Sequence, residues 1–501
     1  MKNILEYLEE SARRVPHKTA FSTGKESITF SELERSARTV GSELLRLGAK
    51  REAVVVFMGK RPATLSAFFG AIYAGCYYVC VDVSMPDARI EGILNSLSAR
   101  FVIYEKATAK RAESLAVEHI LCYDELAIVS EEDELLRGVR ERQLDTDPIY
   151  VVFTSGSTGV PKGVVACHRS VIDYTEALCR ALPFDEETVF GNQTPLYFDA
   201  PLKEIMPTLK LGATTNFIPK MNFSFPILLL DYIRQHGINT VCWVVSALVQ
   251  ISSLGALEAH APTGLRLVAF GSEVFPREEY DKWRRALPEA EFYNLYGPTE
   301  ATGMSCYWHA DRPLEEGEAI PVGRPFDNTE ILLVGEDGRE VAAGESGEIY
   351  IRGTCVTFGY YGNTEQTERA FVQNPRHDLY PETVYRTGDM GRYNERGELC
   401  FLGRKDSQIK HMGHRIELGE IEAAAAKLEG LHRACCVYDE KGKRIVLFFV
   451  GDTAPEEIPH RLSDSLPRHM IPTLCVSLPT MPLTDNGKLD RRGMREMLSS
   501  L

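Results

Sequence analysis

The stretch Thr154-Ser155-Gly156-Ser157-Thr158-Gly159-Val160-Pro161-Lys162-Gly163 directly follows an apolar run, Ile149 to Phe153. Its glycines lack the side chains that would keep backbone N–H groups from a bound anion, its hydroxyls add donors, and Lys162 adds a positive charge. It is not the P-loop of kinases and GTPases, because Pro161 precedes the lysine and Gly163 follows it. A flexible linker is the alternative interpretation. The position behind an apolar strand favours a phosphate-binding loop.

The N-terminal half alternates between strand-like and helix-like apolar patterns. Ser31-Glu32-Leu33-Glu34 is interpreted as a capping box that begins a helix ending near Leu47. Further helices are expected at 4–14, 63–74 and 87–97, and strands near 20, near 28, at 53–58 and at 77–81. This alternation predicts a largely parallel sheet wound by helices. Ligands of such sheets bind beyond the carboxyl ends of the strands, where the loop at Thr154 lies.

The composition indicates a soluble, multidomain protein. The chain has 501 residues, of which 44% are hydrophobic and 25% charged. An excess of 71 acidic over 56 basic residues gives a net charge of −15, which argues against nucleic acid and anionic membranes as partners. No apolar run reaches about 18 residues and the N-terminus is charged, so we expect a cytoplasmic protein. The twelve scattered cysteines, without a Cys-x-x-Cys pair, favour reduced core thiols over disulfides or zinc ligands.

One carboxylate stands out in the segment Asn192 to Ala200, where Asp199 follows the aromatic pair Tyr197-Phe198. A lone buried carboxylate is costly, so Asp199 needs a cation or hydrogen-bond donors. It could equally be the N-cap of a helix. The residues alone leave these two interpretations open.

Two further strand ends carry polar groups. The apolar segment Leu265 to Phe270 ends at Gly271-Ser272-Glu273, after a buried-strand pattern at Val241 to Val245. Asn294-Leu295-Tyr296-Gly297-Pro298-Thr299-Glu300 supplies an aromatic face, a hydroxyl and a carboxylate. These groups suit base stacking, an α-phosphate and Mg²⁺ respectively, although a simple Gly-Pro turn is the alternative.

The C-terminal part begins as a β-rich segment near Gly344 to Tyr350 and leads to a Thr-Gly-Asp turn that ends in Asp389. The two oxygens of a carboxylate can accept both hydroxyls of a ribose. Gly403-Arg404-Lys405-Asp406 is the expected domain boundary, giving domains at 1–405 and 406–501, with a helix from about Ile416 to Lys427. His411 and His414 lie in a basic loop and are expected to be solvated rather than zinc ligands.

Together these motifs resemble the adenylate-forming enzymes, which include acyl-CoA synthetases, luciferases and the amino-acid-activating domains of nonribosomal peptide synthetases. The decapeptide matches the ATP-binding loop of that family at nearly every position, and further matches extend from about Ile28 to Lys488. The resemblance implies an α/β fold. A large N-terminal domain of wound, largely parallel sheets plus a β-rich segment would precede a small mobile α+β C-terminal domain with its hinge at Asp406.

The resemblance also implies ATP and Mg²⁺ as cofactors and assigns the site. Thr299, Glu300 and Lys488 would be catalytic, and Glu300 would hold Mg²⁺. The residues implied for ATP are Thr154, Ser155, Gly156, Ser157, Thr158, Gly159, Lys162, Gly271, Ser272, Glu273, Asn294, Leu295, Tyr296, Gly297, Thr299, Asp389 (for the ribose) and Arg404. The residues implied for the substrate are Asp199, Ala200, Lys203, Trp243, Val268, Phe270, Leu295, Gly303, Met304 and Lys488.

Asp199 distinguishes between substrates, since amino-acid-activating members use an Asp here to pair with the α-ammonium. Trp243 and Phe270 would make the pocket short, and Lys203 would pair with an acidic side chain or point to solvent. The implied reaction is amino acid activation to aminoacyl-AMP with release of pyrophosphate, then transfer to the phosphopantetheine thiol of a carrier protein. The chain ends soon after Lys488 without a carrier motif, so we expect the carrier to act in trans. The alternatives are an acyl- or aryl-acid:CoA ligase of the same fold and a non-catalytic nucleotide-binding or scaffold protein.

Overall fold

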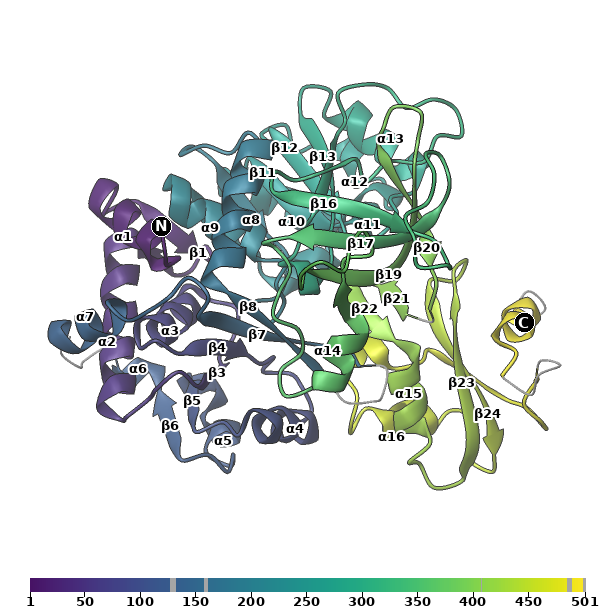
Figure 1. Ribbon diagram of the computed structural model, residues 1–501, viewed down its shortest axis with the longest axis horizontal. Coiled ribbons are helices and arrows are strands. Elements are labelled where there is room, and N and C mark those ends of the chain that lie inside the picture. The colour runs from purple at the N-terminus through teal and green to yellow at the C-terminus, as the bar shows by residue number, and fades with distance from the viewer. Residues whose placement is uncertain (127–131, 157–160, 407, 484–488, 499–501) are drawn as a thin grey trace. The chain divides into compact units, whose positions relative to one another are not determined.

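The computed structural model describes residues 1–126, 132–156, 161–406, 408–483 and 489–498 (Figure 1). The chain divides into two compact units. Unit 1 comprises Met1–Val83, Leu97–Val152 and Gly163–Lys405. Unit 2 comprises Ser84–Ser96, Phe153–Lys162 and Asp406–Leu501. The assignment of 1–405 and 406–501 to an adenylation domain and a lid domain stays a prediction.

The first sheet of unit 1 has six strands in the order β6-β5-β3-β4-β7-β8. Their bounds are β3 Ala53–Phe57, β4 Tyr77–Cys80, β5 Phe101–Tyr104, β6 His119–Cys122, β7 Pro148–Thr154 and β8 Lys162–Cys167. The pairs β3–β4, β3–β5, β5–β6 and β4–β7 are parallel. Val54, Val55 and Val56 are fully buried, as expected for a parallel strand covered on both faces.

The second sheet of unit 1 has nine strands in the order β15-β14-β13-β12-β11-β9-β10-β1-β2. Their bounds are β1 Thr19–Ser22, β2 Ser27–Thr29, β9 Val189–Asn192, β10 Thr214–Phe217, β11 Thr240–Val244, β12 Leu267–Gly271, β13 Glu291–Tyr296, β14 Cys306–His309 and β15 Arg324–Pro325. The strands from β1 through β10, β9, β11 and β12 to β13 are parallel, and β2, β14 and β15 are antiparallel additions at the edges. The predicted largely parallel architecture is confirmed.

A third sheet completes unit 1 and corresponds to the predicted β-rich segment. It runs β16-β17-β19-β18, with β20 paired to β19. The bounds are β16 Thr329–Val334, β17 Gly347–Gly353, β18 Phe371–Gln373, β19 Thr383–Tyr393 and β20 Leu399–Arg404. All of its recorded pairs are antiparallel, in contrast to the two wound sheets.

The long helices of unit 1 cover the wound sheets (Figure 1). They are α1 Leu5–Arg14, α2 Phe30–Arg46, α3 Pro62–Tyr73, α7 Asp133–Arg140, α8 His168–Ala181, α9 Leu202–Leu211, α10 Pro226–Gln235, α11 Val245–Ser253 and α13 Arg277–Ala286; the short ones are α5 Ala109–Ala112, α6 Tyr123–Leu126, α12 Ala256–Ala259 and α14 Thr364–Ala370. The capping box of α2 is Thr29 with Glu32, not Ser31 with Glu34. The helix starts earlier than predicted because strand β2 ends at Thr29, whose hydroxyl accepts from the N–H of Glu32.

In unit 2 the C-terminal segment forms a hairpin, a three-stranded sheet and helices. The bounds are β21 Gln408–His411, β22 His414–Glu417, β23 Leu431–Asp439, β24 Arg444–Gly451, β25 Leu474–Ser477, α15 Leu418–Ala425, α16 Ile458–Leu462 and α17 Arg491–Met497, and α4 is Asp87–Leu97. The helix predicted from Ile416 begins at Leu418 instead, because Ile416 and Glu417 pair with Ile409 and Gln408 in the hairpin.

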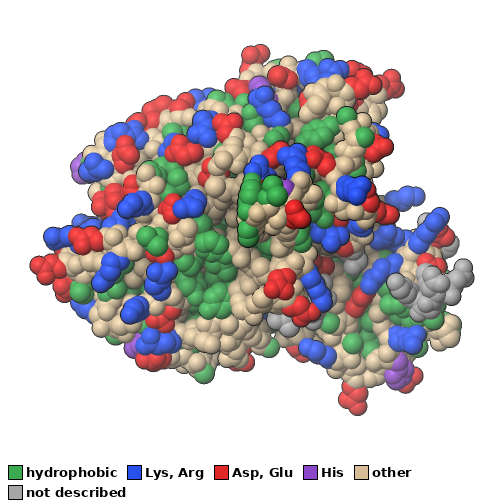
Figure 2. All heavy atoms as spheres, viewed as in Figure 1, with side chains coloured by type: hydrophobic (Ala, Val, Ile, Leu, Met, Phe, Trp, Pro, Cys, Tyr) green, Lys and Arg blue, Asp and Glu red, His purple; other side chains and the backbone are tan. Residues whose placement is uncertain are grey.

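On the face shown in Figure 2, acidic and basic side chains are interspersed rather than gathered by sign. Within the described ranges, no helix combines the length and the hydropathy needed to cross a membrane.

Candidate active site

The described part of the predicted phosphate loop lies, except for Gly163, in unit 2, where it contacts strand β22. Ser155 Oγ donates to the carbonyl oxygen of Arg415 (2.7 Å) and accepts from the N–H of Glu417 (3.2 Å). Lys162 Nζ lies 3.7 Å from Oε1 of Glu417. Ser157, Thr158 and Gly159 of this loop, and also Lys488, lie outside the described residues.

A buried carboxylate accepts a hydrogen bond from a backbone amide of this loop. The Gly156 N–H donates to Oε2 of Glu420 (3.1 Å), and Glu420 is only 1% exposed. The other carboxylate oxygen accepts from Arg89 (2.5 Å). The described loop amide therefore binds an anionic oxygen, which is the chemistry that a phosphate requires.

Asp199 precedes α9 and does not cap it, because the N-cap is Pro201 and the Asp199 carbonyl accepts from the N–H of Leu202. Its side chain is 9% exposed and has no ion pair among the described residues. Burial raises the pKa of its carboxyl, while the Thr299 hydroxyl and Lys203 act in the opposite direction. A Cβ atom at Gly303 would lie 3.7 Å from Oδ2 of Asp199. The structure thus brings Asp199, Thr299, Lys203 and Gly303 together.

Lys203 lies on α9 one helical turn after Asp199 and is 4% exposed. Its charge acts on Asp199, Glu204 and Cys242. Among the residues that the structure describes, Lys203 forms neither a hydrogen bond nor an ion pair within 4.0 Å. The two predicted alternatives, a lysine that pairs with an acidic side chain of the substrate and a lysine that points to solvent, both stay predictions. Cys242, on β11, is also buried, and burial raises the pKa of its thiol well above the ordinary value.

The sequence interpretation missed three polar residues: Glu204, which follows Lys203 on α9, and Asn192 and Lys60, which interact with Glu204. Glu204 is fully buried, and burial raises its pKa to about 7. Asn192 Nδ2 donates to Oε2 of Glu204, while Oε1 of Glu204 has no hydrogen-bond partner. Lys60 Nζ donates to the carbonyl oxygens of Asn192 (3.0 Å) and Gln193 (2.9 Å), and burial lowers its pKa to about 7. The available signal was the adjacent Lys-Glu pair inside the otherwise apolar helix that follows Pro201.

The apolar residues predicted to contact the substrate belong to two different core clusters. Leu295 and Met304 belong to the core cluster that also contains Cys242 and Ala269. Trp243, Val268 and Phe270 belong to a different cluster; Trp243 packs edge-on against Phe223 and donates through Nε1 to the carbonyl oxygen of Gly191 (2.6 Å). Because side chains alternate along a strand, Cys242 and Ala269, which precede Trp243 and Phe270, belong instead to the cluster that contains Leu295. The large rings at positions 243 and 270 therefore belong to a different cluster from Cys242, the residue of β11 on which the Lys203 charge acts.

Asp389 is held in a satisfied network. It is 3% exposed, and its two carboxylate oxygens accept from the hydroxyl of Tyr296 (2.6 Å) and from the guanidinium of Arg404. Arg404 also donates to the carbonyl oxygen of Thr387 (3.1 Å). Burial and the Asp389 charge raise the pKa of Tyr296 well above its ordinary value, so its hydroxyl stays protonated and donates.

The turn after β13 contains a buried carboxylate and a tightly packed glycine. Glu300, in a 3₁₀ turn at Thr299–Ala301, is fully buried and accepts through Oε1 from the hydroxyl of Tyr360 (2.8 Å). A Cβ atom at Gly297 would lie 2.5 Å from Cα of Met304. Only glycine fits there, so this glycine serves backbone packing whatever else it contacts.

The polar groups at the strand end Gly271-Ser272-Glu273 and at Asn294 form hydrogen bonds with neighbouring segments of the protein. Ser272 has φ +67°, and Oε2 of Glu273 accepts from the N–H of Ser246 (2.7 Å) at the start of α11. Asn294 Nδ2 donates to the carbonyl oxygen of Pro321 (2.7 Å). These polar groups have structural partners, and their predicted roles toward ATP stay predictions.

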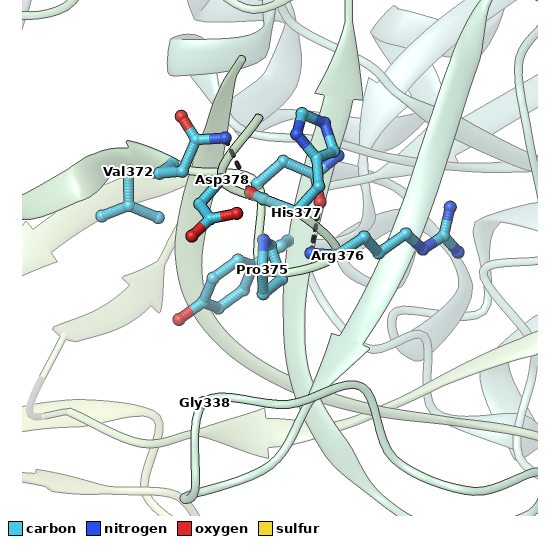
Figure 3. Close-up of a pocket in the computed structure, with 9 residues that line it drawn as sticks. Gly338, Val372, Pro375, Arg376, His377 and Asp378 are labelled. Atoms are coloured by element: carbon cyan, nitrogen blue, oxygen red, sulfur yellow. Dashed lines mark hydrogen bonds between the residues drawn. The ribbon is translucent and has the colours of Figure 1, made fainter. Parts of the chain in front are cut away.

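A shallow depression beside β18 lies apart from these residues (Figure 3). It is lined by Gly338, Tyr350 and the segment Val372 to Asp378. Arg376 there is paired with Glu330 (2.6 Å) and Glu340 (2.9 Å), so its charge is already neutralised. None of the residues predicted to bind ATP or substrate lines this depression.

Comparison with known proteins gives two family matches. Residues 8–361 match the AMP-binding enzyme family, and residues 420–488 match the AMP-binding enzyme C-terminal domain. The chain is 30% identical to the D-alanine--D-alanyl carrier protein ligase of Bacillus licheniformis, covering 98% of this chain and 99% of that protein. It is 28% identical to tyrocidine synthase 1 of Brevibacillus parabrevis over 99% of this chain, but spans only 45% of that protein.

Solved structures share the fold. The Vibrio cholerae adenylation domain AlmE, in complex with glycyl-adenosine-5'-phosphate, matches with a TM-score of 0.85 at 21% identity, covering 99% of this chain and 98% of that one. The o-succinylbenzoate CoA synthetase of Bacillus subtilis matches with a TM-score of 0.83 at 19% identity over the same shares.

Proposed function

Because this chain belongs to the AMP-binding enzyme family, as an adenylate-forming ligase of the type of nonribosomal peptide synthetase adenylation domains and D-alanine–carrier protein ligases, we propose that it activates an amino acid. The amino acid and ATP give aminoacyl-AMP and pyrophosphate. The aminoacyl group then passes to the phosphopantetheine thiol of a carrier protein, and AMP leaves.

The observation that carries this proposal is Asp199, a buried carboxylate without a described ion-pair partner. A desolvated carboxylate is costly unless a cation or several donors compensate it. An α-ammonium would supply that cation, whereas a fatty or aryl acid would leave Asp199 uncompensated. The site therefore favours an amino acid over the acids used by CoA ligases of the same fold.

The adenylation step needs positioning and charge stabilisation rather than a general base, because the attacking group is already a carboxylate. Asp199 would hold the α-ammonium, and Asp389, fixed by Tyr296 and Arg404, would accept the ribose hydroxyls. The loop at Thr154 to Gly163 would hold the phosphates through its amides and Lys162. Lys488 would neutralise charge developing between the carboxylate and the α-phosphate.

Glu300 suits a magnesium ion because its buried carboxylate is a hard oxygen ligand beside the Thr299 hydroxyl. Within the described ranges no group of three or more His, Cys, Asp or Glu residues could form a metal cage. Mg²⁺ usually takes one or two carboxylates plus substrate phosphates, and this donor set fits that arrangement. When bound, the ion would offset the negative charge of the phosphates.

A pyrophosphate-exchange screen tests the proposal, using L- and D-amino acids, their deaminated analogues, and fatty and aryl acids. We expect exchange with amino acids and little with the deaminated analogues. Better exchange with a deaminated acid than with any amino acid would indicate a CoA ligase. ATP binding without exchange for any acid would indicate a non-catalytic nucleotide-binding protein.

The roles of Lys488 and of a hinge at Asp406 form a separate part of the proposal. Lys488→Ala should strongly reduce exchange but still pass a supplied aminoacyl-adenylate to a carrier. Gly413→Leu, in the β21–β22 hairpin turn, should keep exchange and block thioester formation. Equal loss of both half-reactions in both folded variants would contradict the two-position mechanism.

A further inference from the structure

The hydroxyl of Tyr174, on α8, is buried and forms no hydrogen bond with another residue that the structure describes. Tyr174 shares the core-facing side of the helix with Val171 and Leu178 and is 3% exposed. Its ring is held edge-on against Phe326, with the ring centroids 6.4 Å apart. A buried tyrosine hydroxyl usually has a partner, as that of Tyr296 has in Asp389. The hydroxyl of Tyr174 is thus fixed in place and still able to bond a ligand.

The space beside Gly303 is bounded by this hydroxyl and by Asp199. Apart from the chain neighbours of Gly303, the protein atoms nearest to a Cβ atom at this position would be Asp199 Oδ2 at 3.7 Å and Cζ and Oη of Tyr174 at 3.9 and 4.0 Å. Gly303 has φ +94°, a conformation that favours glycine, so no side chain fills this space. A ligand group placed there would contact the carboxylate and the hydroxyl together.

The charges around this space favour a cation. Asp199 has no ion pair among the described residues, and the charge of Lys203 acts on it only from a greater distance. Burial raises the pKa of the Tyr174 hydroxyl well above its ordinary value, so this group adds a polar oxygen without a charge. An anion, such as the α-carboxylate of a substrate, would be repelled by Asp199. An ammonium is attracted by Asp199 and has further N–H groups that can donate to the Tyr174 oxygen.

From these contacts we infer that Tyr174 is a second residue that binds the α-ammonium of the substrate, its phenolic oxygen accepting one N–H while Asp199 accepts another. This inference rests on the proposed function, which places the α-ammonium at Asp199. Two fixed acceptors determine the direction of the bond between the nitrogen and the α-carbon, and so the direction in which the α-carboxylate points. An α-hydroxy acid has a single O–H donor and cannot satisfy both acceptors, so Tyr174 also contributes to the selection of amino acids.

The test compares the wild-type chain with Tyr174→Phe, which removes only the hydroxyl. Tyr150→Phe is the matched control, because the Tyr150 hydroxyl is also buried without a partner and feels the Asp199 charge, but is not among the atoms nearest to Gly303. Pyrophosphate exchange is measured with the amino acid that gives the highest rate, and the concentrations of amino acid and ATP are varied separately. Two competitive inhibitors are compared: the corresponding amino alcohol, which keeps the ammonium, and the deaminated acid, which keeps the carboxylate.

Tyr174→Phe should raise the KM for the amino acid about tenfold, as for the loss of one hydrogen bond to a charged group, and leave the KM for ATP unchanged. The inhibition constant of the amino alcohol should rise by a similar factor, and that of the deaminated acid should stay the same. Tyr150→Phe should change none of these constants. Because the hydroxyl of Tyr174 has no described protein partner, the midpoint of urea unfolding should not fall in Tyr174→Phe.

Three results would overturn the inference while leaving the proposed function intact. The first is an unchanged KM for the amino acid in Tyr174→Phe. The second is weaker inhibition by the deaminated acid rather than by the amino alcohol, which would place the hydroxyl at the α-carboxylate. The third is an equal effect of Tyr150→Phe, which would assign the loss to the general polarity around Asp199. Exchange with fatty or aryl acids alone would overturn the proposed function itself, and the inference with it.

Discussion

Two carboxylates of unit 1, Asp389 and Asp199, are buried almost equally, at 3% and 9% exposed, but have opposite surroundings. Both oxygens of Asp389 accept from Tyr296 and Arg404. Asp199 has no described ion pair, and the lysine beside it has none either. A satisfied network holds a group in one geometry before any ligand arrives, whereas an unsatisfied one is complete only with a ligand. Burial alone therefore does not distinguish these two carboxylates; among the described residues, Asp389 has an ion pair and Asp199 has none.

The largest effect is expected for Asp199→Asn. It should lower kcat/KM for amino-acid-dependent exchange about 1,000-fold, because the substrate ammonium loses its counter-charge. The free energy of unfolding should stay the same or rise by about 1 kcal/mol, since a desolvated carboxylate is removed. Exchange kinetics and urea unfolding measure the two quantities. Asp231→Asn on α10, which alters a carboxylate paired with Arg234, should change neither.

Asp389→Asn should give the opposite pattern. It leaves the largely buried Arg404 guanidinium without its carboxylate, so the free energy of unfolding should fall by about 3 kcal/mol. The preference among amino acids should not change, because Asp389 is assigned to the ribose. Equal losses of stability in Asp199→Asn and Asp389→Asn would remove the distinction between the two carboxylates.

Glu204 should make the stability of the protein depend on pH. With a folded pKa of about 7 against an ordinary value of 4.5, this carboxyl keeps its proton in the folded state where the unfolded chain has lost it. Stability should therefore fall as the pH rises from 4.5 to 7, by about 3 kcal/mol from this group. Glu204→Gln should remove that part of the slope. Urea unfolding between pH 5 and about 8 measures it, and an unchanged slope would contradict the assignment.

The smallest effect is expected for Tyr296→Phe. It removes one hydrogen bond to Asp389 while Arg404 remains, so the free energy of unfolding should fall by about 1 kcal/mol. Tyr293→Phe on the same strand is the control, because its hydroxyl bonds Glu291 in a partly exposed position and should matter less. A larger loss for Tyr293→Phe than for Tyr296→Phe would show that the Asp389 network is not tightly satisfied.

Much of the fold could be predicted from local patterns in the sequence, and so could some residues of the candidate site. The continuous apolar runs at Ala53 and Val241 predict buried strands, because a parallel strand covered on both faces needs no polar alternation. The same lack of alternation hides which residue faces which side. For this reason the sequence did not reveal that Cys242, and not Trp243, lies beside Lys203.

The sequence interpretation missed Lys60 and Asn192 because only the folded arrangement of the sheets brings these two residues together. Lys60 precedes α3 and Asn192 ends β9, so these residues are far apart in the chain and belong to elements around different sheets. Their hydrogen bond exists only after the two wound sheets have formed. No spacing in the sequence could predict this contact, whereas Asp199 could be singled out because it stands alone in an apolar segment.

The thiol of Cys242 has a consequence for the proposed chemistry. An aminoacyl-adenylate is an activated acyl donor, and a thiolate close to it would become acylated in place of the carrier. Thiols react as thiolates, and burial raises the pKa of Cys242 so far that it stays protonated at neutral pH. Under the proposed function, a protonated thiol near the bound adenylate would therefore escape acylation, and iodoacetamide should leave this cysteine unmodified in the folded protein.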